Sequence, residues 1–117
     1  YGGSPLACAA ANAVLRVVTE EKLIERSANL GAKLIEKLRG FSDDHPGLFS
    51  DVRGRGLLVG CEFNDPSRGA DLNLRAVDEG VIVNVAAGRV IRFFPALNIP
   101  EDELFGAVDT VLALAAA

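Results

Sequence analysis

Residues 48–63, LFSDVRGRGLLVGCEF, carry the pattern that decides the fold. In the second half of this stretch two groups of residues alternate along the chain. The first group is apolar throughout and consists of Leu57, Val59, Cys61 and Phe63, and the residues between them are Leu58, Gly60 and Glu62. A period of two places successive side chains on opposite faces of a strand. We therefore expect a strand with one better-buried face.

The glycines that precede this strand, in VRGRG at residues 52–56, allow two interpretations. Glycine permits a positive φ or a close backbone approach, so the segment is either a tight structural turn or a backbone nest for an anion. The chain has no GxGxxG or P-loop pattern in a strand-to-helix context. The structural turn is the favoured interpretation.

Two more strands are expected in VIVNVAAGRVIRFFP, residues 81–95, joined by an Ala-Gly turn. Helices are expected around this sheet: residues 5–18 after an N-cap at Ser4, residues 19–39 after an N-cap at Thr19 with a stop at Gly40, residues 71–79 closed by Gly80, and residues 101–117. The order α-α-β-α-β-β-α predicts an α+β fold, a small, mainly antiparallel sheet with helices packed on it.

The apolar faces of these helices differ. The helix at 19–39 is amphipathic through Leu23, Leu30, Leu34 and Leu38, and the last helix through Leu104, Val108, Val111, Leu112 and Ala115. The first helix, PLACAAANAVL, is apolar around its whole cylinder, so it must be covered on most sides. One small domain has difficulty covering it.

Length and composition favour a single globular domain over residues 1–117, because the chain has 117 residues of which 50% are hydrophobic. The net charge of −4 leaves no basic stripe for nucleic acid, and the longest apolar run is too short to cross a membrane. We expect a soluble, cytoplasmic protein. Cys8 and Cys61 are expected to be small reduced core residues, and His45 in DDHPG a solvated loop histidine.

Arg92, in VIRFFP, is the first candidate for binding chemistry. Strand alternation places it on the face of Val90 and Phe94, while Ile91 and Phe93 point the other way. A guanidinium between large apolar neighbours is costly unless it meets an anion. The favoured interpretation from spacing alone is a structural ion pair with one of the chain's own acids; the alternative is a fork that grips a substrate carboxylate.

A second candidate is YGGSP, where two glycines lead into a helix N-terminus. Such an end can receive a phosphate, although an ordinary capped helix is the favoured interpretation. The chain has no Ser-His-Asp or Cys-His set. Lys22, Lys33 and Lys37 lie on one highly charged helix beside glutamates, whereas a Schiff-base lysine needs a desolvated pocket. By its own residues the chain carries no catalyst.

Four collinear motifs nevertheless resemble one family across essentially the whole chain. YGGSPLACAAANAVL, GLFSDVRGRGLLVGCEF, GVIVNVAAGRVIRFFPALNIPEDEL and the final helix are similar to the C-terminal part of class III, ornithine-type pyridoxal-phosphate aminotransferases, most of all those acting on acetylornithine and succinylornithine. Ser4 stands where the family more often has asparagine. The resemblance implies that residues 1–40 link to a large domain outside the chain and that residues 41–117 form the small α+β domain.

The resemblance also implies a function and its residues. The terminal amino group of N-acetyl- or N-succinylornithine would pass to 2-oxoglutarate in arginine metabolism, in a homodimer that uses pyridoxal phosphate. Arg92 would bind a substrate carboxylate, while Tyr1, Gly2 and Gly3 would lie near the cofactor phosphate of the partner subunit. The Schiff-base lysine would lie upstream, so the chain alone would be inactive. Two alternatives stay open: a free-standing carboxylate-binding module, and a dimerisation domain.

Overall fold

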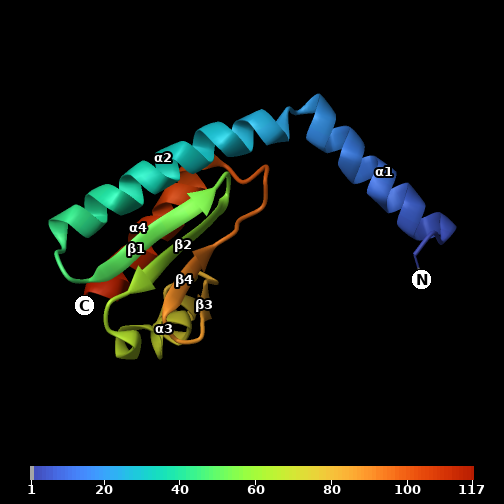
Figure 1. The fold of residues 1–117 in the computed structure, drawn as a ribbon. Coiled ribbons are helices and arrows are strands. Elements are labelled where there is room, and N and C mark those ends of the chain that lie inside the picture. The colour runs from blue at the N-terminus through green and yellow to red at the C-terminus, as the bar shows by residue number, and fades with distance from the viewer. Residues whose placement is uncertain (1) are drawn as a thin grey trace.

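The computed structural model describes residues 2–117 and confirms the α+β class (Figure 1). The elements follow in the order α1 (Pro5–Glu20), α2 (Leu23–Asp44), β1 (Phe49–Arg55), β2 (Leu58–Phe63), a 3-10 turn (Pro66–Gly69), α3 (Leu72–Asp78), β3 (Asn84–Ala86), β4 (Val90–Phe93) and α4 (Glu101–Ala116). The four strands form one antiparallel sheet in the order β1-β2-β4-β3.

Residues 48–63 form a hairpin of two strands, where the sequence predicts one. The chain reverses at Gly56, whose φ of +55° is a left-handed value that glycine adopts without strain. Arg55 then pairs with Leu58, and Val52 with Cys61. The VRGRG segment is therefore β1 and its turn, as the structural interpretation of its glycines predicts.

The second hairpin joins β3 and β4 as expected, but its loop has three residues. Ala87 and Gly88 both have positive φ, and the loop closes with Ala86 paired to Val90. The strand begins at Asn84, later than the sequence predicts. This register places Asn84 directly opposite Arg92.

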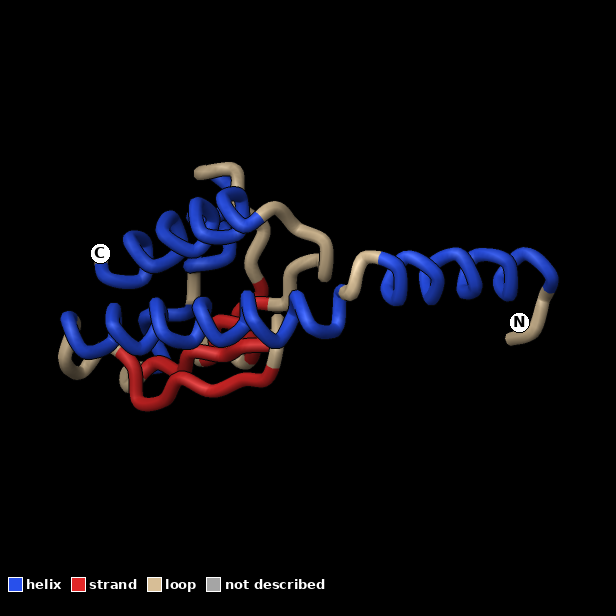
Figure 2. The backbone as a smooth tube through the Cα atoms, turned by 90° about the horizontal axis from the view of Figure 1, so that it is seen from above, coloured by secondary structure: helices blue, strands red, loops and turns tan. Residues whose placement is uncertain are grey.

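One face of the sheet carries the core, because α2 and α4 both pack on it (Figure 2). The predicted apolar faces of both helices are buried in full. On the strand side, the fully enclosed residues are Val59, Cys61, Phe63 and Ile91. The opposite face of the sheet has no helix over it among residues 2–117, and its polar side chains reach solvent.

Helix α2 differs from the prediction at both ends. Thr19 is no N-cap: it lies inside α1, where its hydroxyl donates to the carbonyl oxygen of Leu15 at 2.9 Å. At the other end Gly40 does not stop the helix, which continues to Asp44. The added turn brings Phe41 to within 6.5 Å of the Phe49 ring, so tertiary packing outweighs the stop signal. The helix ends before Pro46, which disfavours helical φ and ψ at the preceding residue.

Helix α1 extends away from the rest of the molecule, and none of its residues is buried (Figure 1). Ser4 caps it as predicted, accepting a hydrogen bond from the Ala7 amide at 3.3 Å. The prediction that Cys8 is a core residue is wrong, because it lies on this uncovered helix. Within residues 2–117, no helix combines the length and the apolar character that crossing a bilayer demands.

Candidate functional site

Four residues form one row across the uncovered face of the sheet. Arg53 on β1 pairs with Gly60 on β2, Gly60 pairs with Arg92 on β4, and Arg92 pairs with Asn84 on β3. Directly opposite residues of antiparallel strands project to the same face. The row therefore places two guanidinium groups and one amide on the open side, with a gap at Gly60.

Arg92 is exposed and lies beside the ring of Phe94, with its Cζ atom 5.4 Å from the ring centroid. Ile91 and Phe93 are buried on the opposite side, as strand alternation predicts. Among residues 2–117, no ion pair or hydrogen bond involves the Arg92 side chain. The favoured prediction of a structural ion pair is therefore wrong, and the guanidinium is available to an external anion.

The acids on this face are held by other arginines. Glu62 contacts Arg53 at 2.9 Å through one carboxylate oxygen and Arg89 at 2.8 Å through the other, while Asp51 contacts Arg53 at 2.7 Å. The hydrogen bonds that Arg53 donates to Asp51 and then to Glu62 raise the pKa of Arg53 above its ordinary value. Asp51 and Glu62 are thus engaged by arginines other than Arg92.

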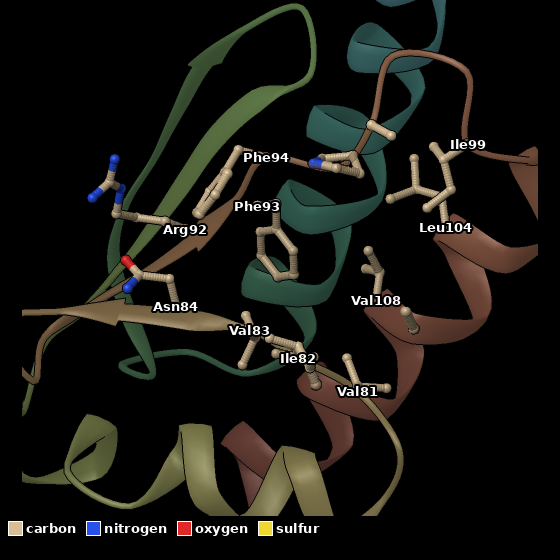
Figure 3. A pocket seen from close by; sticks show the side chains of 14 residues that line it. Val81, Ile82, Val83, Asn84, Arg92, Phe93, Phe94, Ile99, Leu104 and Val108 are labelled. Carbon is tan, nitrogen blue, oxygen red and sulfur yellow. The ribbon is translucent and has the colours of Figure 1, made fainter.

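Asn84 is a polar residue of this row that is not among the site residues predicted from the sequence. Figure 3 shows its amide and the Arg92 guanidinium on the same side of the strands, while Phe93 and Val83 point to the other side. A signal was present in the sequence, because Asn84 is a polar residue inside the apolar run VIVNV. Its position opposite Arg92 depends on the three-residue loop.

Behind the strands lies an apolar cavity of about 510 Å³ between β3, β4 and α4 (Figure 3). Its walls include Val81, Val83, Phe93, Leu104 and Val108. Asn84 and Arg92 also line this cavity, and Arg92 is the charged residue among its described lining residues. The polar row on the open face is thus the better candidate for ligand recognition.

The glycine turn proposed for the cofactor phosphate lies far from this row. Gly2 and Gly3 are exposed at the end of α1 that is remote from the sheet, and Gly3 has a φ of +84° (Figure 1). Tyr1 lies outside the described residues. The structure does not bring Gly2 or Gly3 together with Arg92, and their contact with a cofactor stays a prediction.

The described lysines do not fit covalent attachment of pyridoxal phosphate. Lys33 contacts Glu101 at 2.6 Å, Lys37 contacts Asp109 at 2.7 Å, and Lys22 is exposed at the start of α2. A lysine that acts as a nucleophile needs a desolvated site that favours its neutral form, whereas a neighbouring carboxylate favours the charged form. A site for this cofactor therefore needs residues beyond those described here.

The remaining titratable candidates are structural. Burial raises the pKa of the Cys61 thiol to about 12, so it is a core thiol, as predicted, and a poor nucleophile. His45 is only partly solvated, because its ring stacks on Phe41 at 4.0 Å and its Nδ1 lies 2.9 Å from the Phe41 carbonyl oxygen. It forms the C-cap of α2.

Comparisons with known proteins agree on one family. Residues 1–113 match the family model described as aminotransferase class-III. An ornithine aminotransferase from Halalkalibacterium halodurans is 41% identical over 111 residues, which are 95% of this chain and 27% of that protein. The chain therefore spans about a quarter of the length of such relatives.

Solved structures show the same similarity. The acetylornithine aminotransferase from Elizabethkingia anophelis aligns with a TM-score of 0.84 at 34% identity, over 97% of this chain and 30% of that one. An ornithine aminotransferase from Toxoplasma gondii, with PLP at partial occupancy in its active site, aligns with a TM-score of 0.84 at 33% identity, over 95% of this chain and 26% of that one.

Proposed function

Because this chain belongs to the class-III aminotransferases, we propose that it supplies the C-terminal part of an enzyme of ornithine-type transamination. The enzyme transfers the terminal amino group of N-acetyl- or N-succinylornithine to 2-oxoglutarate in arginine metabolism. In this proposal residues 1–40 connect to a large domain and residues 41–117 form the small domain. The names of the relatives, ornithine and acetylornithine aminotransferase, support this substrate class.

Arg92 carries the proposal, because it is an exposed guanidinium that no acid of residues 2–117 neutralises. A planar guanidinium holds a carboxylate through two parallel hydrogen bonds, which fixes orientation as well as position. Both the amino donor and 2-oxoglutarate have a carboxylate for it to hold. The Phe94 ring lies beside the guanidinium, with 5.4 Å between the Arg92 Cζ atom and the ring centroid, which is within the range of a cation–π contact.

Pyridoxal phosphate supplies the electron sink when it is bound in such an enzyme. In our proposal the lysine that holds it lies outside this chain, so residues 1–117 alone are inactive. Tyr1, Gly2 and Gly3 are proposed to lie beside the cofactor phosphate of the partner subunit. Their support is the exposed glycine turn, which leads into a helix N-terminus where backbone N–H groups favour anions.

We propose that the enzyme is a cytoplasmic homodimer, and helix α1 supports the dimer. Its apolar side chains have no cover within residues 2–117: Leu6 is 83% exposed, and Val14 and Leu15 are each about 60% exposed. Contiguous apolar surface of this kind marks an interaction site. We propose that the large domain and the partner subunit cover it.

The test substitutes Arg92 in the complete enzyme. Arg92→Ala should raise KM for acylated ornithine on the order of 10- to 100-fold, because a hydrogen bond to a charged group contributes about 1.5–3 kcal/mol. Arg92→Lys keeps the charge but loses the two-pronged guanidinium, so its KM for acylated ornithine should lie between that of the unaltered enzyme and that of Arg92→Ala.

Arg39→Ala is the matched control, since it removes an exposed arginine from α2 far along the chain from the row. An unchanged KM in Arg92→Ala for both acylated ornithine and 2-oxoglutarate would contradict the proposal. Saturable binding of these ligands by residues 1–117 alone, lost in Arg92→Ala, would instead favour a free-standing carboxylate-binding module.

A further inference from the structure

Asn84 and Arg92 form a cross-strand pair on the open face of the sheet. Directly opposite residues of an antiparallel pair have Cβ atoms about 4.5–5.5 Å apart. Figure 3 shows the amide and the guanidinium side by side. Both side chains are exposed, and neither makes a hydrogen bond or ion pair with another side chain of residues 2–117.

The chemistry of an Nα-acylated amino acid matches this pair. Its carboxylate and its acyl amide are attached to the same carbon, so a carboxylate held at Arg92 leaves the amide within a few ångströms. An asparagine side chain offers an NH₂ donor and a carbonyl acceptor, which complement the C=O and N–H of an amide. A free amino acid has an ammonium group at that place, and this cation would lie beside the guanidinium.

The other neighbours of Arg92 leave this role to Asn84. On the β2 side Gly60 has no side chain, and beyond it Arg53 is engaged by Asp51 and Glu62. On the strand's far end Phe94 offers an apolar ring. Within the described part of the row, Asn84 is thus the side chain that adjoins Arg92 and can both donate and accept.

We propose that Asn84 recognises the acyl amide of the substrate, so that the Asn84 and Arg92 pair selects an Nα-acylated amino acid over the free amino acid. This inference rests on the proposed function, in which Arg92 holds the substrate carboxylate. It makes Asn84 a specificity residue and gives it no part in the transfer of the amino group.

Calorimetric titration of the complete enzyme with two unreactive ligands tests the proposal. Nα-acetylnorvaline has the carboxylate and the acyl amide, whereas pentanoate has the carboxylate alone; neither has an amino group to transfer. Asn84→Ala should weaken acetylnorvaline binding about three- to tenfold, which is the range of one or two neutral hydrogen bonds, and should leave pentanoate unchanged. Asn73→Ala, an exposed asparagine on α3, should change neither Kd.

Arg92→Ala, measured in parallel, separates the two proposals. If it weakens both ligands while Asn84→Ala affects both equally or neither, the role of Asn84 is overturned and that of Arg92 stands. If Arg92→Ala leaves both Kd values unchanged, or the unaltered enzyme binds neither ligand, Arg92 does not hold the substrate carboxylate. The role proposed for Asn84 is then contradicted as well. A selective loss of acetylnorvaline binding in Asn84→Ala supports the proposal.

Discussion

Gly31 of α2 and Gly56 at the β1–β2 turn are in direct backbone contact. A Cβ atom on Gly31 would lie 2.1 Å from the carbonyl oxygen of Gly56, a distance that no side chain can occupy. One turn earlier on the helix, the Ser27 hydroxyl accepts a hydrogen bond from the Leu57 amide at 3.2 Å. These contacts fix α2 against the hairpin and therefore set the position of the sheet that carries Arg92.

Gly31→Ala should destabilise the fold, because the methyl group has to displace the backbone of the hairpin turn. Overpacking of this kind costs about 1–3 kcal/mol. Gly40→Ala is the matched control in the same helix: nothing lies within 4 Å of its added Cβ. It should stabilise the protein by about 0.5–1 kcal/mol, because alanine has a higher helix propensity than glycine. Urea unfolding measures both, and equal effects would contradict the contact.

Ser27→Ala should also destabilise the fold, since it leaves the amide of the buried Leu57 without a partner. An unsatisfied buried donor costs about 1–3 kcal/mol. Ser42→Ala in the same helix is the control, because its hydroxyl makes no hydrogen bond with residues 2–117. Hydrogen exchange of the Leu57 amide should accelerate in Ser27→Ala alone; an unchanged rate would show that the bond does not protect it.

The helices and the buried faces could be predicted from the sequence because they depend on local periodicity. The apolar positions of α2 and α4 recur at helical spacing, and all are buried. Errors arose where tertiary contacts decide. Gly40 reads as a helix stop, yet the contacts of Phe41 extend the helix past it. Cys8 reads as a core residue, but no segment of residues 2–117 covers α1.

The candidate site was predictable only in part, because it depends on register. Alternation alone places Arg92 with Phe94, but a two-residue turn at Ala87 and Gly88 would pair Arg92 with Val83, one residue away from the observed Asn84. The ion pairs of Glu62 with Arg53 and Arg89 likewise depend on which strands are neighbours. The sequence could not tell which of these arginines lacks an acid.

Cys61 should make the protein less stable at alkaline pH. Burial raises the pKa of its thiol to about 12 from 9.0, so above pH 9 the unfolded chain loses this proton while the folded chain keeps it. Since the unfolded state then binds fewer protons, stability falls as pH rises from 9 towards 12, by up to about 1.4 kcal/mol per pH unit.

Urea unfolding at pH 7.5, 9 and 10.5 checks this prediction. Cys61→Ala will be less stable at every pH, but the decline of its unfolding free energy above pH 9 should be shallower. Cys8→Ala should keep the steeper decline, because Cys8 is exposed. Parallel pH profiles for Cys61→Ala and the unaltered protein would show that another group causes the alkaline loss.

Gly60→Asp should block the candidate site from within, because position 60 lies directly opposite Arg92 on the open face. An added Cβ would lie 3.8 Å from the nearest backbone atom and 3.3 Å from a Val90 methyl group, so the Val90 side chain has to shift by a few tenths of an ångström to admit a side chain. The new carboxylate would pair with the guanidinium and compete with the substrate carboxylate. KM for acylated ornithine should rise on the order of tenfold or more, since hydrogen bonds to charged groups contribute about 1.5–3 kcal/mol.

Gly60→Asn has the same shape without the charge, so its KM should rise far less, and the difference between the two variants should shrink when Arg92 is also replaced by alanine. Equal KM values for Gly60→Asp and Gly60→Asn would show that Arg92 does not hold the substrate carboxylate.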